Sequence, residues 1–474
     1  GELTEAAMQR GLETLRQFRD LAASHRVEQI VTAATSAVRE APNGRDFLQT
    51  ILDDLGMEVD LVSGPEEARL IYLGVLSGMP FGDRPHLLLD IGGGSTELIL
   101  ADGRDARALT STRVGAVRLQ RDFVRDDPMP PQRRSFLRAF IQGSLEPAVD
   151  KVRRRIKPGE TPVLVATSGT AMAIGSLAAS EEERPPRKLH GYRVTRQCLD
   201  KVVDRLITMT PAQRRELASI NDRRAEIIVP GALILQTTMK MLGVEDFVLS
   251  ERALREGLIV DWMLRQGLLE DRFSFQSSIR QRTVIHQVQR FAVNQSRAER
   301  VASHALSLYD ATRGVMHDDN GEGRELLWAA AMLHSCGQHI NINAYHKHTW
   351  YLIRHGELLG YSEAEHLMVA AIARYHRRSL PKKRHESWQL VATRDNRRCV
   401  QQMALLLRLA AALDRRPEPV ISALRIQAVK GTLDLEIVPE RINQNVSLEQ
   451  WSLESCAEVV KEAVGVELRV SVQG

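Results

Sequence analysis

The residues best suited to binding or catalysis form a glycine turn, "DIGGGSTELIL", between two apolar runs. Asp90 ends the first run, Gly92, Gly93 and Gly94 follow, and the second run contains Glu97. Glycines let a ligand approach backbone N–H groups closely, and successive N–H groups in such a turn bind anions. An aspartate at the end of a strand could also hold a hydrated Mg²⁺ against a phosphate chain. The turn therefore predicts a phosphate site.

Other interpretations of this turn fit less well. The dinucleotide fingerprint must open a helix, whereas "STELIL" continues as a strand, and no Gly-Lys-Ser/Thr follows to make a P-loop. A tight hairpin, in which Asp90 only shapes the turn, is the structural alternative. Three consecutive glycines exceed what a hairpin needs, so phosphate binding is the favoured hypothesis.

A second turn of small residues, "ATSGTAMA", follows another apolar run. Ser168, Gly169 and Thr170 are predicted at the N-terminus of a helix, which is a favourable site for an anion. The alternative is an ordinary Ser/Thr N-cap, and for this turn alone that alternative is favoured. Taken together, the two turns indicate two lobes that close on a polyanion.

Three further residues could act at the same site. In "PEEAR", helical spacing puts Glu66 in line with Arg69 and leaves Glu67 free to project into a cleft, although both acids could simply compensate the helix dipole. Glu97 either faces the site or is a solvated strand residue. Arg39 could clamp a phosphate through its fork of donors or form a surface salt bridge.

The elements that must position these residues change character along the chain. A helix capped by Thr4 is predicted over 2–26, a strand over 27–35, mostly helix over 36–56, a strand over 57–64 and a helix over 65–79. This alternation continues to about residue 265 and predicts an α/β region with a mostly parallel sheet. Long amphipathic helices follow to about residue 423. The tail alternates apolar and polar residues, which predicts strands flanking a helix.

Composition narrows the class of protein. The chain has 474 residues, enough for two to four domains, and its 64 Lys+Arg against 60 Asp+Glu give a net charge of only +4. That balance argues against a nucleic-acid-coating protein. Four widely spaced cysteines fit a reducing cytoplasm rather than a disulfide framework. No apolar run reaches membrane-spanning length and no signal-peptide pattern is present, so we expect a cytoplasmic protein, with peripheral membrane association left open.

Several segments together carry a resemblance to a known family. "DIGGGSTELIL", "SGPEEARLIY", "TAATSAVREAPNGRDFL" and "ATSGTAMAIG" resemble the exopolyphosphatase / guanosine pentaphosphate phosphohydrolase (Ppx/GppA) family, in order from the N-terminus to about residue 262. The resemblance implies a two-lobed actin/Hsp70/sugar-kinase-like (ribonuclease H-like) α/β fold. It further implies an all-α HD-like domain and a small α+β tail. The corresponding expected domains are 1–70 (first lobe), 71–265 (second lobe), 276–423 (HD-like) and 424–474 (tail).

The resemblance also implies a function and assigns roles to matching residues. It implies Mg²⁺-dependent release of terminal phosphate from inorganic polyphosphate, with pppGpp hydrolysis as an alternative and a non-catalytic polyphosphate or nucleotide sensor as another. The family's metal-associated aspartate corresponds to Asp90 and its water-activating glutamate to Glu67. Its phosphate-binding turn corresponds to residues 92–94 with Ser95 beside them. We expect a homodimer and no nucleic-acid partner.

One departure concerns the start of the chain. The family begins with a strand that carries an Asp-x-Gly-(Ser/Thr)-(Asn/Ser)-Ser phosphate loop, and no such motif precedes Gly1. Loss of central strands would expose unpaired sheet edges, so a truncated gene model or a fragment is expected rather than an evolved variant.

A second departure lies in the helical region. His304, His334, His376 and Asp414 follow the order of an HD domain, but Ser335 stands where a metal-binding HD site needs an aspartate. A serine hydroxyl is a poor substitute for a charged oxygen ligand, so we expect His334 and Asp414 to serve packing and hydrogen bonding. Hydrolysis by the HD-like region remains a rival hypothesis. The basic segment 374–385 could guide a polyanion, form a solvated face or contribute dimer contacts.

Overall fold

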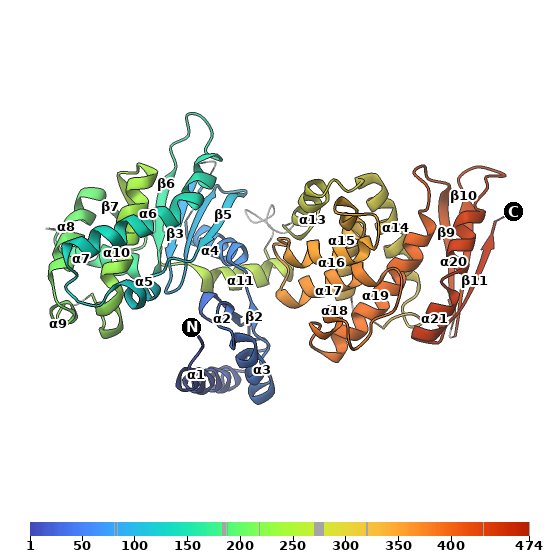
Figure 1. The fold of residues 1–474 in the computed structure, drawn as a ribbon, viewed down its shortest axis with the longest axis horizontal. Coiled ribbons are helices and arrows are strands. Elements are labelled where there is room, and N and C mark those ends of the chain that lie inside the picture. The colour runs from blue at the N-terminus through green and yellow to red at the C-terminus, as the bar shows by residue number, and fades with distance from the viewer. Residues whose placement is uncertain are drawn as a thin grey trace. The chain divides into compact units, whose positions relative to one another are not determined.

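The computed structural model describes residues 1–79, 81–82, 84–182, 186, 188–217, 219–269, 279–318, 321–429 and 431–473. The chain divides into two compact units, Gly1–Ser278 and Ile279–Gly474, which we call the α/β unit and the helical unit (Figure 1). The expected start of the helical region at residue 276 lies outside the described residues. The expected boundary between residues 70 and 71 falls inside a helix, α4 (Gly64–Gly78).

A six-stranded sheet organises the α/β unit. Its strand order is β5-β4-β3-β6-β8-β7, in which β3, β6 and β8 are mutually parallel and the other strands run antiparallel to their neighbours. The bounds are β3 (His86–Ile91), β4 (Thr96–Ala101), β5 (Ala106–Thr112), β6 (Val163–Thr167), β7 (Arg193–Thr195) and β8 (Asp246–Leu249). The predicted strand–turn–strand around the three glycines is confirmed as the β3–β4 hairpin.

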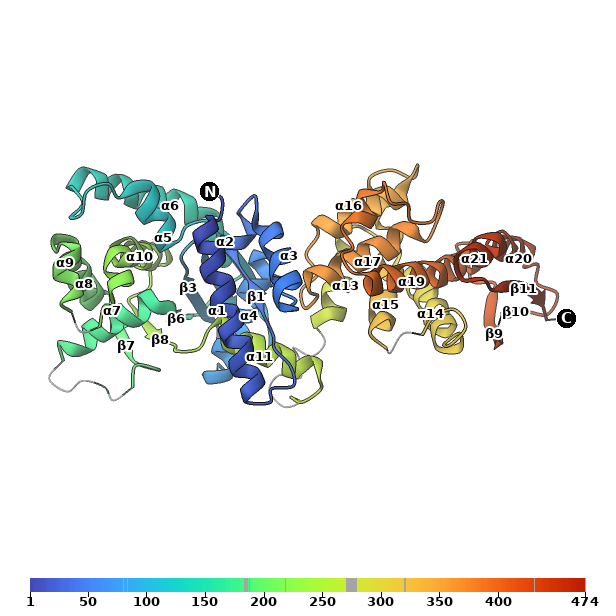
Figure 2. The same ribbon diagram turned by 90° about the horizontal axis from the view of Figure 1, so that it is seen from below.

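Helices cover both faces of this sheet (Figures 1 and 2). Successive strand residues point to opposite faces, so Leu88 packs against α4 and α11 (Leu254–Arg265), whereas Leu87 and Leu89 pack into the opposite core. That second core includes α5 (Ala116–Phe123), α6 (Pro131–Arg153), α7 (Ser168–Ser180), α8 (Arg196–Thr208) and α10 (Asp222–Leu242), and the short α9 (Pro211–Arg215) precedes α10.

No apolar run of membrane-spanning length was expected from the sequence. Among the described residues, however, helix α10 is long and apolar enough to cross a membrane by length and composition. In the structure 67% of its most apolar window is buried, and residues such as Ile228 and Leu235 pack in the core beside the sheet. Helix α10 is thus packed as a core helix of the α/β unit.

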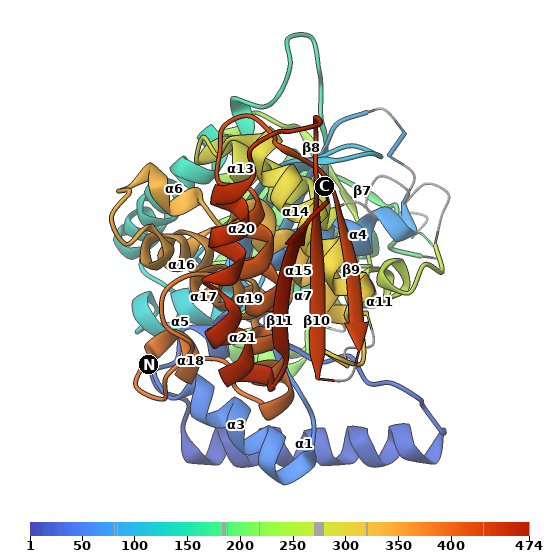
Figure 3. The ribbon, with the colours of Figure 1, turned by 90° about the vertical axis from the view of Figure 1, so that its right-hand side faces the viewer.

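The N-terminal region forms a smaller α/β layer. It consists of α1 (Glu5–Ser24), β1 (Ala33–Ala34), α2 (Ser36–Arg39), α3 (Gly44–Leu55) and β2 (Asp60–Leu61), and β1 pairs with β2 in parallel. The predicted cap is confirmed, because Thr4 Oγ1 accepts a hydrogen bond from the backbone N–H of Ala7 at 3.3 Å. Helices α1 and α3 pack through Leu12, Ile51 and Leu55 (Figure 3).

The two strands of this layer are shorter than predicted. The patterns over 27–35 and 57–64 indicate strands, yet only two residues of each pair in the described chain. Ile30 and Val31 stay 43% and 44% exposed, since no neighbouring strand in the described residues covers them. A strand forms only as far as it has a partner for its backbone groups.

The helical unit contains α13 (Ile279–Arg290), α14 (Gln295–Ala311), α15 (Glu322–Leu333), η1 (Cys336–His339), α16 (Tyr345–His355), α17 (Glu363–Tyr375), α18 (Glu386–Gln389) and α19 (Arg394–Leu413). A three-stranded sheet of order β11-β10-β9 follows, with β9 (Ile421–Val429), β10 (Thr432–Pro439), α20 (Ser447–Glu454), α21 (Ala457–Val464) and β11 (Glu467–Val472). The alternate residues Leu433, Leu435 and Ile437 of β10 are buried in the same core as the helices. The tail therefore packs as part of the helical unit.

Candidate active site

The sheet register brings the two predicted anion turns together. Strands β3 and β6 are parallel neighbours, and Asp90 is the partner of Thr167 at the end of the ladder. The carboxyl ends of parallel strands meet at one edge of a sheet, so residues 92–94 and residues 168–170 follow adjacent strand ends. Both turns follow strands of a single sheet and lie within the expected domain 71–265.

A cluster of three carboxylates lies at the same edge. Asp90 on β3 is directly opposite Glu97 on β4, and the two-residue period puts both on the sheet face that α4 covers. Helix α4 starts close to this face, because a Cβ on Gly64 would lie 2.7 Å from the Cβ of Ser111 on β5. That approach carries Glu67, in the first turn of α4, toward the strand acids. The alternative that Glu97 is a solvated strand residue is excluded, since Glu97 is only 1% exposed.

Burial raises the pKa of all three acids, and for Asp90 and Glu97 the charges of the other cluster members add to the effect. Burial, with the nearby charge of Glu67, raises the pKa of Asp90 to about 7, although its side chain keeps partial access to solvent. Burial and the charges of Glu67 and Asp90 raise the pKa of Glu97 to about 8. Burial also raises the pKa of Glu67, although the Arg39 guanidinium opposes that shift. Like charges this close disfavour simultaneous ionisation, so the cluster is suited to a cation.

The donor chemistry of the cluster fits Mg²⁺. Carboxylate oxygens are hard ligands, and Mg²⁺ uses one or two protein carboxylates while water and phosphate complete its octahedron. In the described residues no three His, Cys, Asp or Glu side chains form a ready-made metal cage. Asp90, with Glu97 beside it, would hold such an ion together with substrate oxygens, and the ion would supply charge neutralisation of the phosphate.

The glycine turn leaves backbone donors accessible. Gly92 N–H closes the hairpin on Ser95 O at 2.9 Å, whereas the N–H groups of Gly93 and Gly94 donate no hydrogen bond within the described part of the chain. None of the three has a left-handed φ. Glycine is required here by close approach, since a Cβ on Gly94 would lie 2.6 Å from Ser36 Oγ. The turn is therefore a hairpin with two unused backbone donors, which is the arrangement that an anion nest requires.

The second turn is a helix N-terminus, as predicted. Helix α7 begins at Ser168, and its N-cap Thr167 makes no capping hydrogen bond with its side chain. Ser168 adopts φ +96°, a costly conformation for a residue with a side chain and one that clusters at functional sites. Its hydroxyl accepts from Ala171 N–H at a long 3.4 Å, so the plain N-cap alternative explains the turn poorly. The side chain of Thr170 is buried beside Gly231 of α10.

The acids of "PEEAR" are partly as predicted. Glu66 pairs with Arg69 through contacts of 2.7 and 2.9 Å, which confirms the helical spacing. Glu67 is not free, because Arg39 Nη1 donates to Glu67 Oε2 at 3.1 Å and to Val62 O at 2.6 Å. Arg39 thus forms a partly buried ion pair that orients Glu67, rather than the surface salt bridge that was one of its two alternatives.

Three residues near the turns were not predicted from the sequence. Ser36 lies beside Gly94, and Arg118 Nε donates to Gly94 O at 3.1 Å. Arg224 of α10 places its guanidinium against Gly169, and in the described chain it forms no ion pair. Ser36 stands within the motif "TAATSAV", which was a usable signal. Arg224 lies 55 residues beyond Gly169 in the sequence, and only the packing of α10 on α7 brings them together.

The predicted phosphate contact Ser95 is buried, and its hydroxyl hydrogen-bonds to Glu97.

Comparison with known structures finds relatives that match more than half of the chain. An exopolyphosphatase from Cytophaga hutchinsonii is 26% identical over 57% of this chain and 85% of its own, with a TM-score of 0.52. An exopolyphosphatase-like protein is 27% identical over 56% of this chain and 87% of its own, with a TM-score of 0.51. The Ppx/GppA family member of Aquifex aeolicus is 27% identical over 56% of this chain and 84% of its own, with a TM-score of 0.48.

Family models cover both units. The model of the Ppx/GppA phosphatase family matches residues 1–266, and the model of Ppx/GppA phosphatase domain III matches residues 279–457. The first match alone spans more than half of the chain and includes the carboxylate cluster and both anion turns. The chain therefore belongs to the Ppx/GppA phosphatase family.

Proposed function

We propose that this phosphatase is an exopolyphosphatase, which hydrolyses the terminal phosphoanhydride bond of inorganic polyphosphate with the help of Mg²⁺. The observation that carries the proposal is the cluster of Glu67, Asp90 and Glu97 next to two turns with anion-binding geometry. The similarity to an exopolyphosphatase from Cytophaga hutchinsonii supports the same substrate class.

The chain's own residues position the phosphates and accept a proton from the attacking water. The free N–H groups of Gly93 and Gly94 bind oxygens of the terminal phosphoryl group, and Arg224 and the N-terminus of α7 bind the adjacent phosphate. Glu67, oriented by Arg39, accepts a proton from the attacking water. Asp90 would hold Mg²⁺, and the bound ion would neutralise negative charge on the phosphate. Catalysis by position and charge is what phosphoryl transfer requires.

A cavity next to the cluster favours a chain-like polyanion. Its volume is about 420 Å³, and Arg39, Arg113 and Lys151 line it together with the single acid Glu40. Successive phosphates of a long chain would meet this basic lining, whereas pppGpp presents only three phosphates at its 5′ end. Hydrolysis of pppGpp is the second candidate, because the same acids and turns act on the same type of bond. We further expect the enzyme to work as a cytoplasmic homodimer.

The decisive experiment replaces the proposed base. Glu67→Gln should lower phosphate release from long-chain polyphosphate by about a hundredfold or more, the range for loss of a general base, while polyphosphate binding in Mg²⁺ persists. Glu58→Gln, the same change at an exposed residue of the α/β unit, should leave release unchanged. Retained turnover in Glu67→Gln would overturn the assignment.

The substrate is tested separately on the unmodified protein. Rates of phosphate release from long-chain polyphosphate and from pppGpp should be compared at equal concentration of terminal phosphate. A higher kcat/KM for pppGpp would favour the second candidate. Binding in Mg²⁺ with no hydrolysis of either substrate would instead identify a sensor.

A further inference from the structure

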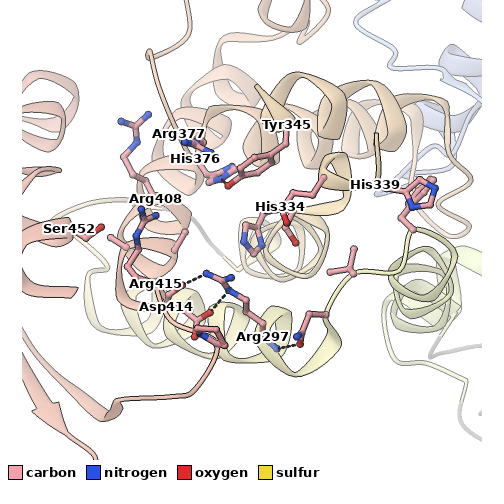
Figure 4. Close-up of a pocket in the computed structure, with 18 of the residues that line it drawn as sticks. Arg297, His334, His339, Tyr345, His376, Arg377, Arg408, Asp414, Arg415 and Ser452 are labelled. Atoms are coloured by element: carbon pink, nitrogen blue, oxygen red, sulfur yellow. Dashed lines mark hydrogen bonds and ion pairs between the residues drawn. The ribbon is translucent and has the colours of Figure 1, made fainter. Parts of the chain in front are cut away.

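The helical unit has a pocket that the proposed phosphatase chemistry does not use (Figure 4). Its volume is about 560 Å³, within the roughly 300–1,000 Å³ typical of small-molecule sites. Residues of α14, α16, α19 and α20 and of the segments that follow α13, α15, α17 and α19 line it. The pocket is therefore large enough for a metabolite and is built from several elements of one compact unit.

The lining carries an excess of positive charge. Four arginines line the pocket against one carboxylate, that of Asp414: Arg297, Arg377, Arg408 and Arg415. The two histidines His334 and His376 do not add to this charge. Burial lowers the pKa of His334. Burial and repulsion from His334 lower the pKa of His376 well below its ordinary value. A small anion is the complementary ligand.

The carboxylate of the pocket is already neutralised. Arg297 Nε and Arg300 Nε each lie 2.8 Å from one oxygen of Asp414, and Arg297 also donates to the Asp414 carbonyl at 2.6 Å. Since Ser335 supplies no second acid, the donor set does not fit a hydrolytic metal centre. The guanidinium groups of Arg297 and Arg300 balance the charge of the Asp414 carboxylate, as a bound metal ion would otherwise do.

Two other arginines are left uncompensated. Arg408 Nη2 donates to the carbonyls of Arg378 at 2.7 Å and Tyr375 at 3.2 Å, whereas its Nη1, which is not fully buried, donates no hydrogen bond among the described residues. In the described chain no carboxylate pairs with Arg408, and its burial lowers its pKa. Arg415 is exposed and likewise forms no ion pair among the described residues. A guanidinium held by backbone carbonyls, with a donor still free, is preorganised for a phosphate oxygen.

Rings line the other side of the pocket. Phe291 and His339 both line it, with ring centroids 6.0 Å apart. In Figure 4, His339 lies across the pocket from Arg408 and Arg415, and Tyr345 lies between these ends. Arg377 stacks on the Tyr345 ring at 4.9 Å. The pocket thus has a cationic end for phosphate and an aromatic end for a planar ring.

We propose that this pocket binds a nucleoside phosphate without a metal ion, with its phosphates on Arg408 and Arg415 and its base against Phe291 and His339. The juxtaposition of uncompensated arginines with an aromatic wall carries the assignment. Such a ligand would occupy the helical unit independently of the phosphatase chemistry in the α/β unit.

The test uses the full-length chain and a fluorescent probe, N-methylanthraniloyl-ADP, in EDTA. Without a divalent ion the carboxylates of the α/β unit repel the probe, so saturable binding reports on the helical pocket. Arg415→Gln and Arg408→Gln should each raise the Kd about tenfold or more, as expected for loss of a charge-assisted hydrogen bond. Arg415 is exposed, so its variant will fold even if the Arg408 variant does not.

Two controls make the outcome decisive. Arg394→Gln removes an exposed charge from the same helix, α19, outside the pocket, and should leave the Kd unchanged. Ser335→Asp adds a negative charge to the lining and should weaken binding. Absence of binding in EDTA, or equal affinity in Arg415→Gln and Arg394→Gln, would overturn the proposal. Displacement of the probe by inorganic tripolyphosphate as readily as by ADP would overturn the nucleoside assignment.

Discussion

Asp90 and Glu97 face each other across the β3–β4 ladder, and burial raises their pKa values to about 7 and about 8. Two acids in this position repel each other unless a proton or a cation lies between them. The pair therefore links metal binding, pH dependence and stability of the α/β unit.

The pair makes the metal-free protein less stable at higher pH. A carboxyl whose folded pKa lies above its unfolded value binds its proton more tightly in the folded state, so folding is favoured while that proton is bound. This contribution is complete below the ordinary pKa near 4 and is lost as the pH rises through the folded values of about 7 and 8. Urea unfolding in EDTA should show a lower free energy of unfolding at pH 8.5 than at pH 5.

The same measurement on Asp90→Asn supplies the control. Loss of one acid removes its own titration and part of the repulsion on Glu97, so the drop between pH 5 and pH 8.5 should shrink. Addition of Mg²⁺ should also reduce the drop in the unmodified protein. An equal drop in both proteins would show that the pair does not govern it.

Asp90→Asn should also abolish most of the activity. The amide keeps the shape but cannot balance the charge of a bound cation, so phosphate release should fall about a hundredfold or more, as for loss of an electrostatic stabiliser. The remaining activity should need more Mg²⁺ for half saturation, measured by titrating Mg²⁺ at fixed polyphosphate. Asp54→Asn, a change at an exposed residue of α3, should leave both values unchanged.

Arg39→Gln should change the pH profile of the reaction. Arg39 lowers the pKa of Glu67 against the effect of burial, so its loss should raise that pKa further. The rising limb of kcat/KM against pH should then move to higher pH, because the proposed base must be ionised to accept a proton. Arg16→Gln, at an exposed position of α1, is the matched control. A uniform loss of rate with an unmoved profile would contradict this role for Arg39.

Gly94→Ala should impair the glycine turn by steric contact. The added Cβ would lie 2.6 Å from Ser36 Oγ, and the turn must shift to relieve the contact. We expect kcat/KM to fall about tenfold or more, since small displacements of a phosphate site are costly. Ser36→Ala combined with Gly94→Ala should recover part of the loss. Gly143→Ala, in helix α6 with nothing within 4 Å of the new Cβ, should leave activity unchanged.

Local patterns in the sequence were enough to predict several elements of the site. The glycine turn between two apolar runs predicted the β3–β4 hairpin, and the small-residue turn predicted the start of α7. Helical spacing predicted the Glu66–Arg69 pair. These features depend on backbone preferences and on neighbours within a few residues, so a linear pattern contains the information needed.

Which of these elements lie close enough to act together depends on the three-dimensional fold. The parallel pairing of β3 with β6 put both turns at one edge of a single sheet, although about 75 residues separate them in the sequence. Packing of α2 against the start of α4 paired Arg39 with Glu67, and packing of α10 on α7 brought Arg224 to Gly169. In the helical unit, Arg297 and Arg300 neutralise Asp414 from more than a hundred residues away. Such contacts depend on register and helix packing across the chain, which no local pattern encodes.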